Sequence, residues 1–175
     1  MRPSTLLVLC MLTLGTIGLT LSGAMAQTSD AGCVLEPTDG GRSILRCADG
    51  LSITVEPGAR YSLIDRNSDG KADGAALRSK AVLIDGPAGA AGGFKVITPQ
   101  AIAAVRGTRW AVDVAGGKTA VFVVRGRVSV QRATGGERVV LRPGEGVDVD
   151  RGTGPLTVKR WPAARVSALL ARLGQ

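Results

Sequence analysis

The sequence contains no histidine, and aromatic residues make up only 3% of its 175 residues. The missing imidazole removes the commonest general base, the Ser-His-Asp and Cys-His nucleophile systems, and histidine metal sites. The carboxylates of the later half are spread over predicted turns and strand ends. They could form a glycosidase-type pair or simply face solvent. We therefore expect that the protein is not an enzyme. These carboxylates are Asp113, Glu137, Glu145, Asp148 and Asp150.

Runs of four or more basic residues are also missing, although the formal net charge is +8. A basic balance favours contact with anionic surfaces such as lipid, polysaccharide or nucleic acid, and it also keeps a protein soluble. The arginines are scattered along the chain, and there is almost no aromatic surface on which bases could stack. We therefore expect no nucleic-acid partner.

Long apolar stretches are absent except at the start of the chain. Residues 1–26 contain Arg2, the apolar stretch Leu6 to Leu21 and a small-x-small sequence that ends at Ala26, which is typical of a signal peptide cleaved before Gln27. The alternative is an uncleaved anchor, but the apolar stretch is shorter than the ~20 residues of a spanning helix. We expect a periplasmic or secreted protein that does not span the membrane after cleavage.

Export decides how the few cysteines are interpreted. Cys10 leaves with the signal peptide, whereas Cys33 and Cys47 remain as a pair in an oxidising compartment. This predicts a disulfide that closes a loop of about 15 residues and contributes ~3 kcal/mol in the chain-entropy model. The alternative, a zinc site, is poorly supported because two thiols without any histidine make an incomplete ligand set.

A polar loop over residues 65–73 has the spacing of the first part of an EF-hand, with Gly70 at relative position 6. Position 12 is Ala76, where the bidentate Glu should stand, and no helices flank the loop. Two interpretations stay open: a weak Ca²⁺ site, or a polar turn made of residues that favour turns. The candidate ligands at positions 1, 3, 5 and 9 are Asp65, Asn67, Asp69 and Asp73.

Apolar residues that alternate with polar or small ones dominate the middle of the chain, and glycine turns interrupt them. This period of two, with turns about every 8 to 12 residues, predicts an all-β fold of many short strands, either a β-sandwich or a solenoid. We also expect residues 119–124 and 127–132 to form a hairpin across Arg125-Gly126. The predicted strands are 43–47, 51–55, 60–64, 80–84, 94–98, 119–124, 127–132, 138–141, 146–149 and 156–158.

The C-terminal residues follow a different period. Val166, Leu169, Leu170 and Leu173 fall at i, i+3, i+4 and i+7 after Pro162, which predicts a short amphipathic helix. We expect it to cover an open end or edge of the β domain. Docking to a partner or to an anionic lipid surface is the alternative.

A central segment carries a family resemblance. Thr98-Pro99, the Val105-Arg106-Gly107-Thr108 sequence, Trp110 and the later residues 141–146 resemble the FecR domain over roughly residues 50–150. The resemblance implies an all-β periplasmic module. In full-length members it implies a membrane-spanning regulator that passes an outer-membrane signal to a cytoplasmic sigma factor. No sigma-binding region or spanning helix follows residues 1–26, so we expect a soluble periplasmic module.

These observations predict a signal peptide (1–26), an N-terminal segment with the disulfide (27–48), a FecR-like β domain (49–150), and a linker with the C-terminal helix (151–175). We expect an exported, non-catalytic binding, regulatory or scaffold module in envelope signalling, which meets an envelope protein by strand addition at a sheet edge. The alternative is a Ca²⁺-assisted binder of envelope polysaccharide or anionic lipid. Binding through scattered arginines should weaken steeply with ionic strength, whereas strand addition should not.

Overall fold

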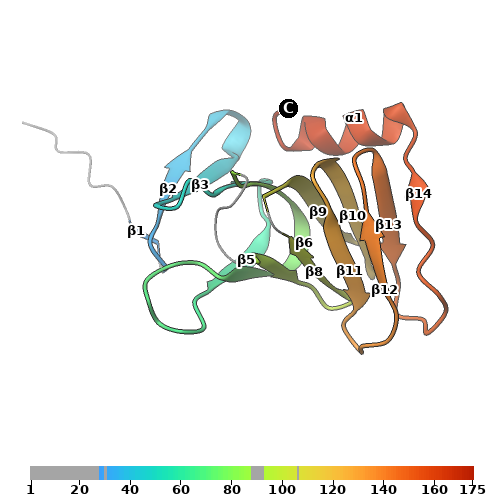
Figure 1. Ribbon diagram of the computed structural model, residues 1–175. Helices are drawn as coiled ribbons and strands as arrows, with labels where there is room; N and C mark the ends of the chain where they lie inside the picture. The colour runs from blue at the N-terminus through green and yellow to red at the C-terminus, as the bar shows by residue number, and fades with distance from the viewer. Residues whose placement is uncertain (1–27, 30, 88–92, 106) are drawn as a thin grey trace, which may run out of the picture.

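The computed structural model describes residues 28–29, 31–87, 93–105 and 107–175 (Figure 1). The predicted signal peptide and Arg106 lie outside the described residues. The described chain forms fourteen strands, one short 3-10 helix and one α-helix, so the predicted all-β fold with a C-terminal helix is confirmed. Its strands form two sheets that share one long strand, β6 (Gly74–Asp85).

Sheet A contains the second half of β6 and lies next to the α-helix. Its other strands are β1 (Thr28–Ser29), β2 (Cys33–Pro37), β3 (Ser43–Cys47), β4 (Ser52–Val55), β9 (Arg109–Ala115), β10 (Lys118–Arg125), β13 (Glu145–Val149) and β14 (Lys159–Arg160). Sheet B contains the first half of β6. Its other strands are β5 (Arg60–Ile64), β7 (Lys95–Ile97), β8 (Ala101–Val105), β11 (Val128–Arg132) and β12 (Arg138–Leu141).

Strand β6 turns the corner between the two sheets at Lys80. Up to Ser79 it pairs with β5 and β7, and from Lys80 onward it pairs with β9. Lys80 has a φ of 69°, in the left-handed region that non-glycine residues rarely adopt, and the β5–β6 register shifts beside it. The sequence predicted only the part from residue 80 to 84, so the first half of this strand was missed.

The predicted hairpin across Arg125-Gly126 is wrong. β10 pairs with β9 and β13, whereas β11 pairs with β8 and β12, so the chain passes from sheet A to sheet B at this point. Gly126 has a φ of 87°, which allows the change of direction. Alternate apolar side chains of the two strands are nevertheless fully buried, as the period of two predicts: Val121, Val123, Val128 and Val130.

The main hydrophobic core lies between the two sheets. Trp110 and Val112 of β9 meet Val96 of β7 and Val128 of β11 there, and all four side chains are fully buried. Their neighbours along each strand face the other way, as the period of two requires. The core therefore fixes which residues of each strand reach the outer faces.

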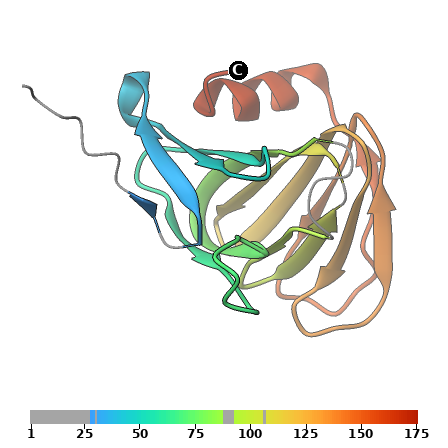
Figure 2. The same ribbon diagram turned by 60° about the vertical axis from the view of Figure 1, so that its left-hand side comes forward.

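Helix α1 (Ala163–Arg172) packs on the outer face of sheet A, above a second apolar cluster (Figures 1 and 2). Leu169 and Leu173 bury themselves against Leu83 of β6 and Phe122 of β10, and Phe122 stacks on Trp161 at a ring-centroid distance of 5.1 Å. The predicted helix is thus present, but it covers a sheet face and not an end or edge. The apolar outer face of a sheet is shielded from water only when another element packs over it.

The N-terminal strands continue sheet A. β2 and β3 pair so that Cys33 stands directly opposite Cys47, and the two form the predicted disulfide, with a Cα–Cα distance of 4.0 Å. The short 3-10 helix η1 (Asp39–Gly41) connects these strands. The predicted strand 156–158 is wrong, because β14 begins only at Lys159. Over the described residues, no helix has the length and apolar character needed to cross a membrane.

Candidate functional site

A groove of about 490 Å³ lies on the outer face of sheet B, the face turned away from the core. This volume is within the range of small ligand sites. No helix in the described part of the chain packs over this face, since α1 lies on sheet A. The groove is lined by Arg66, Lys95, Ile97, Ile102, Ala104, Ser129, Gln131 and Arg138.

Strand register builds the groove from two rows of side chains. Ile97 of β7 pairs with Ile102 of β8, which pairs with Gln131 of β11, which pairs with Arg138 of β12. Alternate residues of a strand face the same side, so the next outward row runs parallel to the first. This second row consists of Lys95, Ala104, Ser129 and Val140. The floor of the groove therefore consists of apolar side chains and the amide of Gln131, and Lys95 and Arg138 lie at its two sides.

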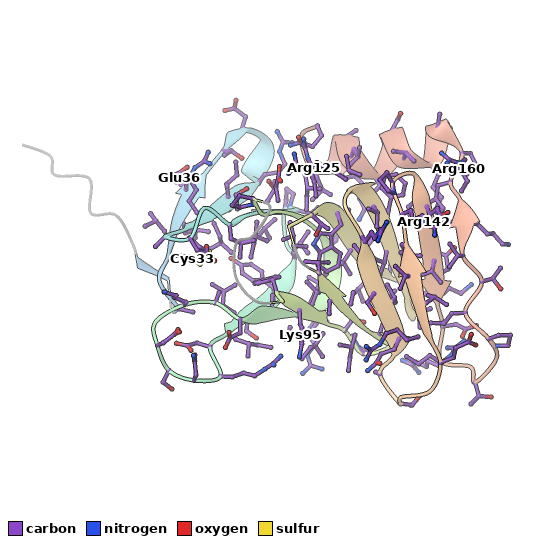
Figure 3. All side chains as sticks on the ribbon, viewed as in Figure 1. Cys33, Glu36, Lys95, Arg125, Arg142 and Arg160 are labelled. Carbon is purple, nitrogen blue, oxygen red and sulfur yellow. A yellow bond between two sulfur atoms is a disulfide. The ribbon has the colours of Figure 1, made fainter. Side chains whose placement is uncertain are left out.

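The cations of this face have no carboxylate partner in the part of the chain that the structure describes. The strand segments that form sheet B contain no Asp or Glu. Arg138 donates from Nε and Nη2 to Oε1 of Gln131, at 3.3 and 3.1 Å, and this contact leaves its charge uncompensated. Among the described residues, no ion pair involves Arg66, Lys95 or Arg138. Figure 3 shows Lys95 on the side of the molecule away from α1.

Three acids are engaged between sheet A and α1. Arg172 of α1 contacts Glu56 at 2.6 Å and Asp113 at 2.7 Å, and Arg165 pairs with Asp148 of β13. Burial raises the pKa of Glu56, but hydrogen bonds from Arg172 and from the N–H of Ala81 outweigh it, so its pKa lies below the usual value. The carboxylates thus hold the helix in place and leave the groove basic.

The predicted calcium loop lies between β5 and β6, and Arg66 in this loop lines the groove. The carboxylate of Asp65 accepts hydrogen bonds from the N–H groups of Asp69 and Gly70, at 3.3 and 2.9 Å, and Asp73 accepts one from the N–H of Arg66 at 2.9 Å. The amide of Asn67 donates to Asp69. Within the described ranges, no group of three or more His, Cys, Asp or Glu side chains is placed to hold a metal ion. The Ca²⁺ site stays a prediction.

The family-motif residue Thr98 joins the two sheets. Its Oγ1 accepts a hydrogen bond from the N–H of Ala101 at 2.9 Å and lies 2.8 Å from Oγ1 of Thr119, which donates to Gln100 at 2.9 Å. All three side chains of this network are buried. Buried hydroxyl and amide groups need such partners. Thr98 therefore fixes the turn at Pro99, between β7 and β8, against β10 of the other sheet.

The rest of the motif forms the crossing from β8 to β9. Val105 ends β8, Gly107 has a φ of 56°, and Thr108 packs its methyl group against Gly126 of the opposite crossing. Trp110 is fully buried in the core. Thr108 Oγ1 and Trp110 Nε1 are buried and have no hydrogen-bond partner among the described residues. These residues determine the path of the chain and do not contribute side chains to the groove.

The groove itself was missed by the sequence analysis. A signal for it was present: Asp113 is the one acid among residues 86–136, a stretch that also contains Lys95, Arg125 and other bases. The strand pattern alone could not show that Lys95 and Arg138 belong to one face, because that depends on how β7, β8, β11 and β12 pair. The scarcity of acids in this stretch pointed to a basic face only once the order of the strands in sheet B was known.

The fold and the groove together define an all-β module with one basic, uncovered sheet face. The chain belongs to the FecR family: the family described as FecR protein matches residues 34–129, more than half of the sequence. The match includes the residues from Thr98 to Trp110 that carry the resemblance. It begins in β2, upstream of the region where the motif residues lie.

Two crystal structures from Parabacteroides distasonis, each provisionally described as an anti-sigma factor, are similar to this chain. The first has a TM-score of 0.59 and 21% identity and covers 78% of this chain. The second has a TM-score of 0.48 and 20% identity and covers 82% of this chain. This chain spans 64% and 62% of their lengths. At these identities the first likeness shows the fold alone. No curated protein matches the sequence.

Proposed function

We propose that this chain is an exported, non-catalytic FecR module that takes part in envelope signalling by binding a partner protein on the outer face of sheet B. The observation that carries this proposal is the groove, with three cations that no described carboxylate neutralises. Membership of the FecR family supports the regulatory role. The solved structure with the same fold, provisionally described as an anti-sigma factor, supports it further.

The chemistry of the groove favours binding over catalysis. Its lining residues in the described part of the chain include no carboxylate, thiol or imidazole. Proton transfer at neutral pH usually uses one of these groups. The partly exposed apolar side chains of Ile97 and Ile102, by contrast, stabilise a complex when a partner covers them.

Sheet B also offers two free strand edges. Among the described strands, β5 pairs only with β6, and β12 pairs only with β11. An edge strand has backbone N–H and C=O groups available for another chain. β12 borders the groove and exposes 54% of Val140, so the predicted strand addition would take place here. Arg138 on the same strand is the kind of charge that restricts which chains can pair.

Site-specific photo-crosslinking in the native bacterium tests the proposal. A photoreactive amino acid replaces Ile102, on the floor of the groove, and the control position is Lys118, which lies beside the β9–β10 turn outside it. We expect one envelope protein to be captured from Ile102 and not from Lys118, with the crosslinked peptides identified by mass spectrometry. Equal capture from both positions, or no protein captured from Ile102, would overturn the proposal.

A second candidate function is Ca²⁺-assisted binding of envelope polysaccharide or anionic lipid. The observation that favours it is the position of Arg66, which belongs both to the predicted calcium loop and to the groove lining. A cation held by the loop would add positive charge beside the groove. Binding of this kind should weaken with EDTA and fall steeply with ionic strength, which distinguishes it from a protein partner held mainly by apolar and backbone contacts.

A further inference from the structure

We infer that the groove on sheet B binds an extended acidic peptide segment whose two carboxylates lie about four residues apart. This inference rests on the proposed function and specifies the chemistry of its partner. It follows from the placement of the groove's cations, from the apolar floor between them, and from the absence of aromatic side chains in its lining.

The cations lie at opposite sides of the groove. Lys95 is on β7 and Arg138 is on β12, and β8 and β11 lie between these strands. Neighbouring strands are about 4.8 Å apart, so three steps give roughly 14 Å across the strands. Lys95 aligns with Val140, two residues along β12 from Arg138, so the diagonal span is roughly 16 Å. An extended chain advances about 3.3–3.6 Å per residue, so roughly four to five residues span this distance. A peptide that crosses the strands can therefore place one carboxylate near each cation.

The floor between the cations suits the middle of such a peptide. Ile97, Ile102 and Ala104 provide apolar surface, and Ser129 and Gln131 provide hydroxyl and amide groups that can meet a peptide backbone. This arrangement favours apolar residues between the two acids. Strand addition along β12 is a separate mode of binding, because an added strand would run parallel to β12 and would leave Lys95 out of reach. The inferred peptide segment lies across the strands and not along the edge of β12.

The same face suits a glycan or a bilayer less well. Glycan sites commonly use an aromatic ring under the sugar, but Phe94, Trp110, Phe122 and Trp161 are buried and Tyr61 packs against the core. Interfacial membrane binding needs apolar side chains that protrude into the lipid. Here Ile97 and Ile102 line a hollow and are only half-exposed.

Acids next to groove-lining residues are Glu137, which precedes Arg138 but lines a different hollow, and those of the loop 65–73. Asp65, Asp69 and Asp73 each accept hydrogen bonds from backbone N–H groups within this loop. None of them lines the groove. The charge that an incoming carboxylate meets on the floor and its sides is therefore that of Arg66, Lys95 and Arg138.

Peptide binding to the purified chain without residues 1–26 tests this inference. The probe is a fluorescein-labelled heptapeptide with two Glu residues four positions apart and Val between them. Control peptides carry Lys in place of Glu, or two adjacent Glu residues. At low salt we expect the first peptide to bind at least about 5-fold more tightly than either control, since each exposed charge pair contributes roughly 2- to 5-fold in affinity.

Variants then locate the binding site. We expect K95E and R138E each to weaken binding by roughly 5- to 20-fold, because each removes one charge pair and adds a repulsion. The control K118E makes the same charge change outside the groove and should change the affinity by less than about 2-fold. Circular dichroism and the melting temperature confirm that the variants fold. Lys peptides should recover binding to the K95E/R138E double variant.

Three other outcomes of these binding experiments would overturn the inferred peptide ligand. Equal loss in K118E means non-specific electrostatic attraction and overturns the inference. Failure of the Glu peptide to bind also overturns it, but the proposed function stands if Ile102 still crosslinks to one envelope protein. The chain could instead bind vesicles of phosphatidylglycerol in phosphatidylcholine, lose this binding in K95E, and bind no peptide. This result overturns the inferred peptide ligand in favour of a lipid surface.

Discussion

Arg172, at the end of α1, donates from Nη1 to Oδ2 of Asp113 on β9 at 2.7 Å. The same guanidinium donates from Nε and Nη2 to both carboxylate oxygens of Glu56, at 3.0 and 2.6 Å. The two acids are well shielded, with side-chain exposures of 11% for Glu56 and 17% for Asp113. One arginine therefore compensates two partly buried carboxylates and fixes the last turn of the helix to sheet A.

Replacing Arg172 by Met should destabilise the fold, because Glu56 and Asp113 would lose their shared partner while they stay shielded from water. Hydrogen bonds to charged groups contribute about 1.5–3 kcal/mol, so we expect a loss in this range in the free energy of unfolding. Urea unfolding measures it. Arg151→Met is the control: Arg151 is exposed and has no ion pair among the described residues, so a change below about 0.5 kcal/mol is expected. Equal losses in the two variants would show that the contacts of Arg172 with Glu56 and Asp113 do not stabilise the fold.

The same contact predicts a pH dependence. The pKa of Glu56 lies below its usual value of 4.5 in the folded protein, so Glu56 contributes stability above pH 4.5 and loses it as the pH falls through its folded pKa. Glu56→Gln should therefore reduce the free energy of unfolding at pH 7, and the difference from the unmodified protein should shrink toward pH 3. Urea titrations at several pH values measure this. A difference that stays constant with pH would contradict it.

The sequence predicted local structure well and strand pairing poorly. The strands at 43–47 and 60–64, the C-terminal helix and the Cys33–Cys47 disulfide follow from alternation, turn residues and cysteine count, which are properties of short segments. The hairpin at Arg125-Gly126 was wrong because a turn of this kind can reverse the chain within one sheet or carry it to the other. Nothing in the sequence marks Lys80 as a corner, since lysine does not usually adopt a positive φ.

The calcium prediction has a direct thermal test. With a dissociation constant of about 10⁻⁴–10⁻³ M, 10 mM Ca²⁺ added after EDTA should raise the stability by about 1.4–2.7 kcal/mol and shift the melting temperature upward. The double variant Asp65→Asn/Asp69→Asn should abolish the shift, and Mg²⁺ at the same concentration controls for ionic strength. An unmoved melting temperature would mean that residues 65–73 are only a polar turn, held by their own backbone hydrogen bonds.

The crossing between the sheets gives the last prediction. Gly126 has a φ of 87°, and a Cβ there would lie 2.2 Å from Cγ2 of Thr108. Gly135 has a φ of 89° with nothing within 4 Å of its Cβ position. Gly135→Ala should therefore cost about 1–2 kcal/mol for the left-handed backbone alone. Gly126→Ala should cost a further ~1–3 kcal/mol for the clash.

A second substitution separates strain from clash at this crossing. Thr108→Ser removes the methyl group that meets residue 126, so adding it to Gly126→Ala should recover part of the lost stability, although it costs stability on its own. Chemical unfolding of the four proteins in this double-mutant cycle gives the coupling between the two positions. A coupling of zero would mean that Thr108 does not pack against Gly126 in solution. A favourable coupling above ~0.5 kcal/mol would show that Thr108 is held against Gly126 of the opposite crossing and serves the path of the chain.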